Sequence, residues 1–347
     1  MISSTSLISV LPLVPLRRQC DGYSRSSIPN SFPGVSMPSF QRNIILQCKP
    51  RFGMRSFSSF STQVKTQAVR GRVLSLAEQN EVEEKFQVVA AVRSVYNDIV
   101  IVDTPQSRML LLDSSHNVHS ILTRGEKWTG SYWDEFASLP AIVPEGPIAI
   151  FGLGAGTAAH LMLDLWPSLE LHGWEIDRIL VDKAREYFAL SDLEKHTPTG
   201  GILHVCVGDA LSPSVNVSGG YSGIIVDLFS DGNVLPQLQE VSTWLELHDK
   251  LMPNGRFMVN CGAANDGVSD AASPEFSAID HSWVQNSTIR ALYQAFPTKL
   301  NWKKTPKEEG ENYIALTGPL PDLATWSAVL PDRLSSTVNQ WKPCLPL

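Results

Sequence analysis

The sequence has few cysteines and lacks the local patterns that mark several kinds of enzyme. Its five cysteines are irregularly spaced, which is unlike a disulfide framework. It contains no C-x-x-C, H-x-x-x-H or G-x-S-x-G pattern, so we expect neither a metal site nor a serine nucleophile at a strand-to-helix turn. The most apolar run, residues 148–166, is interrupted by glycines, His160 and Asp164. It is therefore no candidate for a membrane span, and we expect no membrane partner.

Acidic residues are almost absent from the first 77 positions, which hold ten Lys or Arg, one acid (Asp21) and eighteen Ser or Thr. This composition is typical of an organelle transit peptide. Because Pro12 and Pro15 would break an amphipathic mitochondrial helix, we expect the chloroplast stroma, with the mitochondrion as the alternative. A secretory signal is a rival interpretation, since residues 7–16 are apolar, but no basic residue precedes them. We predict a disordered transit peptide over 1–66 and a linker or helix over 67–85.

The charge of the remaining chain is strongly negative. Residues 78–347 carry 18 basic and 34 acidic side chains, a net charge of −16. Such a surface repels phosphate backbones, so we expect no nucleic-acid partner and favour a small-molecule acceptor.

Two patterns of secondary structure follow the predicted transit peptide and linker. Residues 86–140 alternate in short β-branched runs and predict a small antiparallel sheet with a helix. Residues 141–318 alternate strands with helices, which predicts a mostly parallel sheet, ending in two strands around a charged turn at 306–311. We expect an α/β protein with a Rossmann-like, seven-stranded class I methyltransferase fold preceded by the small β domain. No function is derived for the C-terminal tail, 319–347.

The most informative motif is a glycine turn after the first apolar strand of this second region. The run I-A-I-F-G-L-G-A-G places Gly152, Gly154 and Gly156 before a helix, and Glu175 follows Gly156 by nineteen positions. Glycines allow close approach of the backbone to a ligand, and a carboxylate one strand later can bind the hydroxyls of a ribose. The pattern predicts a nucleoside-containing cofactor. The NAD-type motif G-x-G-x-x-G is present only in its weaker form G-x-G-x-x-A, which begins at Gly154 and ends at Ala159. A dinucleotide therefore stays an alternative.

Further acidic residues fall at the predicted carboxyl ends of strands. Asp209, beside Ala210, can accept from an adenine amino group, although a helix N-cap explains it equally well. Asp227 follows a run predicted to be buried, where its pKa is raised enough to take a proton from a nucleophile. Asp231, four residues later, is expected to lie in a loop and to help hold a cationic substrate.

Several segments between residues 86 and 318 resemble the spermidine synthase family. Its serine, tyrosine and glutamine entry motif is similar to S-V-Y-N at 94–97, its Y-x-E-x-x-x-H-x-P helix to residues 132–140, its V-E-I-D to residues 174–177, and its D-S-S-D to residues 227–231. The resemblance implies that Asn97 contacts the cofactor, that Tyr132 contacts the substrate, and that Asp227 is the base. It also implies a homodimer through the small sheet.

The positions at which this sequence departs from the family pattern are ones that serve polyamine chemistry in that family. The acid that holds the ammonium of decarboxylated S-adenosylmethionine in the family is replaced by Ala155, and the histidine of the helix motif by Ser138. A desolvated cation without a carboxylate is unfavourable by several kcal/mol, so the substitution favours S-adenosyl-L-methionine as cofactor. The favoured function is a methyltransferase acting on a small-molecule acceptor. The alternatives are a polyamine aminopropyltransferase that uses decarboxylated S-adenosylmethionine, a non-catalytic plastid scaffold, and an NAD enzyme.

Overall fold

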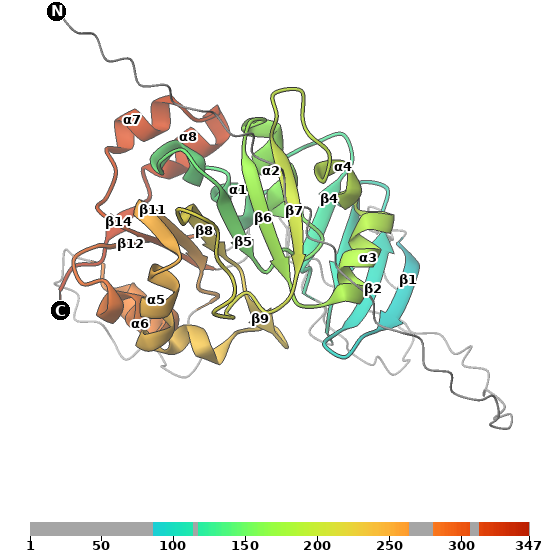
Figure 1. Cartoon of the computed structure of the whole chain (residues 1–347), viewed down its shortest axis with the longest axis horizontal. Coiled ribbons are helices and arrows are strands. Elements are labelled where there is room, and N and C mark those ends of the chain that lie inside the picture. Colours follow the sequence, from blue (N-terminus) through green and yellow to red (C-terminus); the bar gives the residue numbers. More distant parts are fainter. Residues whose placement is uncertain (1–85, 114–116, 264–279, 306–311, 347) are drawn as a thin grey trace, which may run out of the picture. The chain divides into compact units, whose positions relative to one another are not determined.

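The computed structural model describes residues 86–113, 117–263, 280–305 and 312–346. The predicted transit peptide, 1–66, and the predicted linker, 67–85, lie outside the described residues. Figure 1 shows a small sheet from the N-terminal part of the described chain beside a larger sheet flanked by helices. Within the described residues, no helix combines the length and apolarity that spanning a membrane requires.

The small sheet is an antiparallel meander in the order β1-β2-β3-β4. Alternation along its second strand buries Ile99 and Ile101 completely, and these side chains join the core of the larger sheet. Hydrogen bonds fix the two sheets together, because the Ile121 amide donates to Thr157 Oγ1 and the Thr157 hydroxyl donates back to the Ile121 carbonyl. The four strands are Gln87–Arg93, Asp98–Asp103, Ser107–Leu111 and Ser120–Thr123.

The larger sheet has eight strands in the order β14-β12-β13-β11-β8-β5-β6-β7. Five neighbouring strands of this sheet, β11, β8, β5, β6 and β7, pair in parallel. Strand β13 is antiparallel to both of its neighbours, β11 and β12. This is the predicted class I methyltransferase order with one further edge strand. Its strands, in chain order, are β5 Ile148–Phe151, β6 Glu170–Glu175, β7 Ile202–Val207, β8 Tyr221–Val226, β11 Leu251–Asn260, β12 Leu300–Lys304, β13 Tyr313–Thr317 and β14 Lys342–Pro343.

Helices cover both faces of this sheet, and each face has its own apolar cluster. One face packs against helices that begin after β5 and β6, and the other packs against two helices near β11. Strands β5 and β8 are buried along their whole length, as expected for central strands of a parallel sheet with helices on both faces. The helices are α1 Tyr132–Phe136, α2 Thr157–Leu165, α3 Arg178–Tyr187, α4 Leu190–Leu193, α5 Val241–His248 and α6 Ser287–Ala295, with 3₁₀ turns η1 Leu139–Ile142, η2 Pro236–Gln239 and η3 Ser282–Gln285.

The segment between β8 and β13 differs from the sequence expectation. The sequence pattern predicts one helix over about 238–251, but η2 precedes α5 and α5 ends at His248. The pattern P-N-G at 253–255 predicts a turn, but these residues lie inside β11, where pairing with β8 shifts register and Asn254 has a φ of 64°. Proline, asparagine and glycine therefore make a bulge in a continuing strand here, because flanking residues on both sides still pair with β8.

The C-terminal tail is structured and packs on the sheet. Helices α7 (Leu323–Ala328) and α8 (Asp332–Val338) lead to β14, which pairs with β12. The indole of Trp326 donates to the Ser138 carbonyl just after α1. Beneath the tail, the Lys303 ammonium lies 2.7 Å from a Glu135 carboxylate oxygen, and only 1 % of the Lys303 side chain is exposed. The tail thus holds the end of α1 through the Trp326 hydrogen bond, and β12 holds it through a buried ion pair.

We expect Lys303→Met to destabilise the protein by about 3–5 kcal/mol, because it removes the cation from a buried ion pair. Urea unfolding of the two proteins measures this difference. The control is Lys195→Met, which removes the exposed cation paired with Asp192 and should change the free energy of unfolding by less than about 1 kcal/mol. Equal losses in the two variants would contradict a structural role for the buried pair.

Candidate functional site

The glycine turn joins β5 to α2 with all three glycines at positive φ: 87° at Gly152, 56° at Gly154 and 90° at Gly156. A Cβ at Gly152 would lie 2.2 Å from the carbonyl oxygen of Asp227, and one at Gly154 would lie 2.7 Å from Ser120 Oγ. The glycines are therefore required by neighbouring parts of the protein as well as by the turn itself. Their spacing alone does not identify a ligand.

The amide groups of this turn already have acceptors inside the protein. Gly152 donates to the Trp174 carbonyl, Gly154 donates to Glu175, and Gly156 donates to the Leu153 carbonyl. The turn therefore offers a ligand close approach to the backbone, because its N–H groups are engaged within the protein.

Glu175 ends β6 and points toward the glycine turn. Its Oε2 accepts from the Gly154 amide at 3.0 Å, and its Oε1 accepts from the Asp177 amide at 3.1 Å. Burial raises the pKa of Glu175, although these amide donors act in the opposite direction. The carboxylate and the turn are therefore held together, as the predicted nucleoside site requires. Beside it, Ile176 and Val207 are 41 % and 42 % exposed, which leaves apolar surface at the ends of β6 and β7.

Asn97 lies next to this carboxylate but is bound to a different acid. Its side-chain amide donates to Asp177 Oδ2 at 2.9 Å, and the Ser94 hydroxyl donates to the same oxygen. The other oxygen of Asp177 caps α3 by accepting from the amides of Ile179 and Leu180. The S-V-Y-N segment thus fixes the small sheet to the end of β6, close to Glu175.

Asp227 follows β8, whose last three residues are fully buried. Its carboxylate accepts three hydrogen bonds: from Asn260 Nδ2 at 2.9 Å, from the Tyr132 hydroxyl at 3.2 Å and from Trp133 Nε1 at 3.2 Å. Burial raises its pKa to about 6, against the effect of these donors. Burial and the nearby Asp227 charge also raise the pKa of Tyr132. Near neutral pH this is a carboxylate able to accept a proton.

A small cavity of about 10 Å³ lies between Asp227 and the glycine turn. Its wall includes Gly152, Leu153, Trp133, His119 and Ser120. The imidazole of His119 lies 3.2 Å from an Asp113 carboxylate oxygen, and burial lowers the pKa of this histidine. The cavity therefore has a carboxylate on one side and a histidine–aspartate pair on another.

Two further predicted site residues lie in exposed turns. Asp209 is exposed and its Oδ1 accepts from the Leu211 amide, in a turn that no helix follows, while Ala210 is buried. Asp231 is exposed at the tip of the hairpin β9–β10 (Phe229–Ser230 and Asn233–Val234), with a φ of 50°. No hydrogen bond among the described residues links Asp231 to Asp227.

Sequence reasoning missed three residues near the candidate base: Asn260 and Trp133, which donate to it, and His119, which lines the same cavity. Asn260 ends β11, the strand next to β8, so the rule that placed Asp227 at a strand end applies to it equally. Trp133 follows Tyr132 in α1, but an indole in a short helix carries no signal of its own. His119 precedes β4, and only tertiary packing brings it to the cavity.

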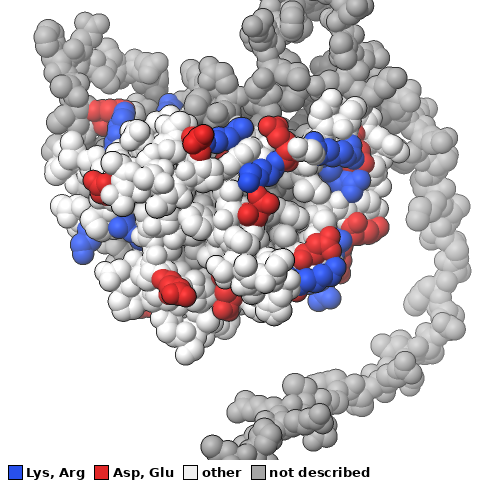
Figure 2. All heavy atoms as spheres, turned by 90° about the horizontal axis from the view of Figure 1, so that it is seen from above, with Lys and Arg blue, Asp and Glu red and all other residues white. Residues whose placement is uncertain are grey.

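Charges are mixed over the face shown in Figure 2. Basic and acidic side chains are interspersed there, without an extended area of one sign among the described residues. This distribution gives no basic groove on that face for a phosphate backbone.

Comparison with known proteins gave no matching family model. The chain is 25 % identical over 215 residues to a curated protein of Bifidobacterium longum described as "Probable polyamine aminopropyl transferase". That similarity covers 59 % of this chain and 46 % of the relative, so the chain spans about half the length of the curated protein it matches.

Solved structures show the same fold. A probable spermidine synthase from Corynebacterium glutamicum aligns with a TM-score of 0.51 at 17 % identity, covering 70 % of this chain and 87 % of that one. Spermidine synthase from Thermotoga maritima aligns with a TM-score of 0.47 at 16 % identity, covering 67 % and 72 %. The predicted fold class is confirmed, and so is the resemblance to the spermidine synthase-like branch of that fold.

We expect Gly152→Ala to destabilise the protein more than Gly125→Ala. Both positions have positive φ, 87° and 78°, so both variants pay the strain of a left-handed side chain, about 1–2 kcal/mol. Only the first would also force a Cβ against the Asp227 backbone, since a Cβ at Gly125 meets nothing within 4 Å. Urea unfolding should show a further loss of about 1–3 kcal/mol at Gly152. Indistinguishable losses would mean that the two segments are not in close contact.

The raised pKa of Asp227 predicts a pH dependence of stability. The pKa of the Asp227 carboxyl is 3.8 in the unfolded chain and about 6 in the folded protein, so the folded state binds the proton more tightly. Its contribution to the free energy of unfolding therefore falls as pH rises from about 4 to about 6, by up to about 3 kcal/mol. Urea unfolding across this range should show the fall in the native protein and not in Asp227→Asn. Parallel curves would refute the raised pKa.

Proposed function

We propose that this chain is a transferase that binds an adenosyl sulfonium compound and transfers an aminopropyl group from it to a small amine. The observation that carries the proposal is the joint placement of Glu175 against the glycine turn and of Asp227 at a cavity that begins at the same turn. The similarity to the curated aminopropyl transferase supports aminopropyl transfer better than methyl transfer.

The donor site is built from the ends of β5, β6 and β7. Glu175 is the acceptor for the hydroxyls of the ribose, because it is an oriented and buried carboxylate beside an open surface. The exposed side chains of Ile176 and Val207 offer apolar contact to the faces of an adenine ring. Asp209, beside Ala210 after β7, is the proposed acceptor for the adenine amino group. The sulfonium end then lies toward the cavity of Asp227.

The reaction is a displacement at carbon. The nitrogen lone pair of the acceptor forms a bond to the carbon next to the sulfonium, the carbon–sulfur bond breaks, and its electrons stay on sulfur to give a neutral thioether. Asp227 takes the proton that the amine must lose, which its pKa of about 6 allows at neutral pH. Tyr132, Trp133 and Asn260 hold the carboxylate in position.

Methyl transfer from S-adenosyl-L-methionine is the second candidate, and a specific residue favours it. Ala155 stands where the family has the acid for the donor's ammonium, and it is buried and donates its amide to Ser120 Oγ. For aminopropyl transfer, the ammonium must therefore be held by other groups at the cavity. Among the residues that line the cavity the carboxylate is Asp227, so it would hold this ammonium as well as act as the base.

The sulfur product distinguishes the candidates. The full chain is incubated with a diamine and with either decarboxylated S-adenosylmethionine or S-adenosyl-L-methionine, and products are identified by mass spectrometry. We expect methylthioadenosine from the decarboxylated donor, and a rate lower by 10²–10⁴-fold in Asp227→Asn because the general base is lost. Formation of S-adenosylhomocysteine alone would replace aminopropyl transfer by methyl transfer. Donor binding without either product would indicate a non-catalytic protein.

A further inference from the structure

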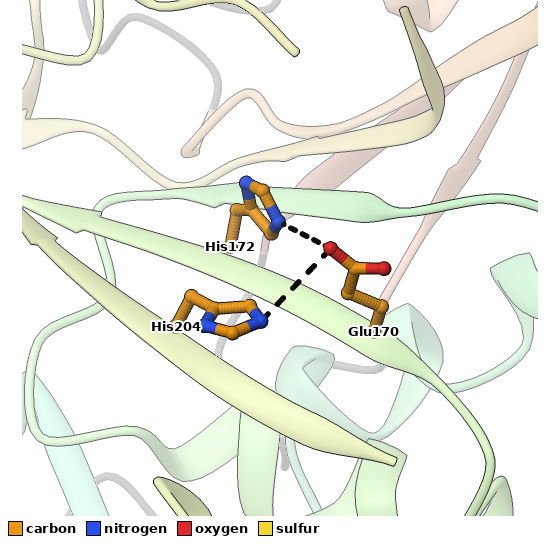
Figure 3. A group of neighbouring side chains, drawn as sticks. All are labelled: Glu170, His172 and His204. Atoms are coloured by element: carbon orange, nitrogen blue, oxygen red, sulfur yellow. Dashed lines mark hydrogen bonds and ion pairs between the residues drawn. The ribbon is translucent and has the colours of Figure 1, made fainter. Parts of the chain in front are cut away.

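Two histidines and a glutamate form a cluster on one face of the larger sheet, away from the donor site. Glu170 and His172 lie two residues apart on β6, so their side chains share a face. His204 on β7 is the direct partner of His172 in the parallel pairing. Figure 3 shows both imidazole rings directed at the Glu170 carboxylate.

The ligand atoms converge closely. His172 Nε2 is 2.9 Å and His204 Nε2 is 3.9 Å from the same oxygen, Glu170 Oε1, and all three atoms lie within 4.8 Å of one another. Ligands of tetrahedral zinc, at about 2.0–2.1 Å from the metal, are about 3.3 Å apart. Small side-chain rotations are therefore enough to bring the three atoms to metal-binding distances.

In the structure His172 Nε2 is 2.9 Å from Glu170 Oε1, a contact in which Nε2 carries the proton, so metal binding at Nε2 requires the other tautomer of the ring. Its Nδ1 is 3.3 Å from the Tyr221 hydroxyl at the start of β8. When Nδ1 carries the proton and donates to that oxygen, Nε2 is the unprotonated nitrogen that a metal requires. Histidine ligands in metal sites commonly have such an acceptor on the second nitrogen.

The cluster is open to solvent because this part of the sheet lacks a covering helix. The connection from β7 to β8, residues 208–220, contains only turns and irregular backbone. The side chains of Glu170 and His204 are 51 % and 48 % exposed, and His172 is 17 % exposed. A bound ion would thus keep at least one position for water.

We propose that Glu170, His172 and His204 form a binding site for a divalent transition metal of the zinc type. Two neutral imidazoles and one carboxylate suit Zn²⁺, Co²⁺ or Ni²⁺ better than Mg²⁺ or Ca²⁺, which prefer oxygen ligands. The cluster lies toward the beginnings of β6 and β7, whereas Glu175 and the glycine turn lie at the opposite ends of the strands. The site is therefore separate from the proposed transfer reaction and does not depend on it.

Titration of the purified full chain with Zn²⁺ tests the site. We expect one ion bound per chain with micromolar or tighter affinity, and at least tenfold weaker binding in His204→Gln, which removes one ligand. Co²⁺ added in place of Zn²⁺ should give the visible absorption of a low-coordinate complex in the native chain only. Zn²⁺ should also raise the melting temperature of the native chain more than that of the variant.

The matched control is His196→Gln, which removes an exposed loop histidine whose Nδ1 contacts the Gly200 carbonyl. It should bind Zn²⁺ as the native chain does. Melting temperatures without metal establish that both variants fold, since both substituted side chains are exposed. Equal Zn²⁺ affinity in the native chain and in His204→Gln would overturn the proposal. The absence of binding to the native chain at about 100 micromolar Zn²⁺ would overturn it too, because any weaker affinity is that of a weak surface contact.

Discussion

The contact between the glycine turn and the end of β8 is the constraint on which the site depends. Gly152 lies so close to the Asp227 backbone that no Cβ fits between them, and the Asp227 amide donates to the Phe151 carbonyl. Parallel pairing of β5 with β8 brings the two strand ends together. The same contact therefore sets the turn that Glu175 contacts and the position of the candidate base.

Contacts of several α1 side chains hold this helix against the end of β8. Tyr132 and Trp133 donate to Asp227 from α1, while Glu135 of the same helix is paired with Lys303 beneath the C-terminal tail. The C-terminal tail, which carries no recognisable motif, thus supports the site from outside it. Buried ion pairs of this kind fix geometry more than they add stability, because desolvation offsets most of their attraction.

The sequence predicted the alternation of strands and helices in a mostly parallel sheet, the turn at Gly152–Gly156, the place of Glu175 one strand later, and the strand-end position of Asp227. It was less informative where local and tertiary preferences compete. Residues 253–255 have the composition of a turn, yet they form a bulge because β8 continues to pair on both sides. The tail gave no strand signal, since β14 is two residues long and exists only through its pairing with β12.

By itself, the sequence determined the alternation of strands and helices, and with it the edge of the sheet where a ligand site forms. This follows because hydrophobic periodicity and glycine content act locally along the chain. Only the tertiary structure decided which side chains meet. Asn260, Trp133 and His119 come to the cavity, and His204 comes to His172, through strand pairing and packing between distant segments, while Asp231 stays on an exposed turn.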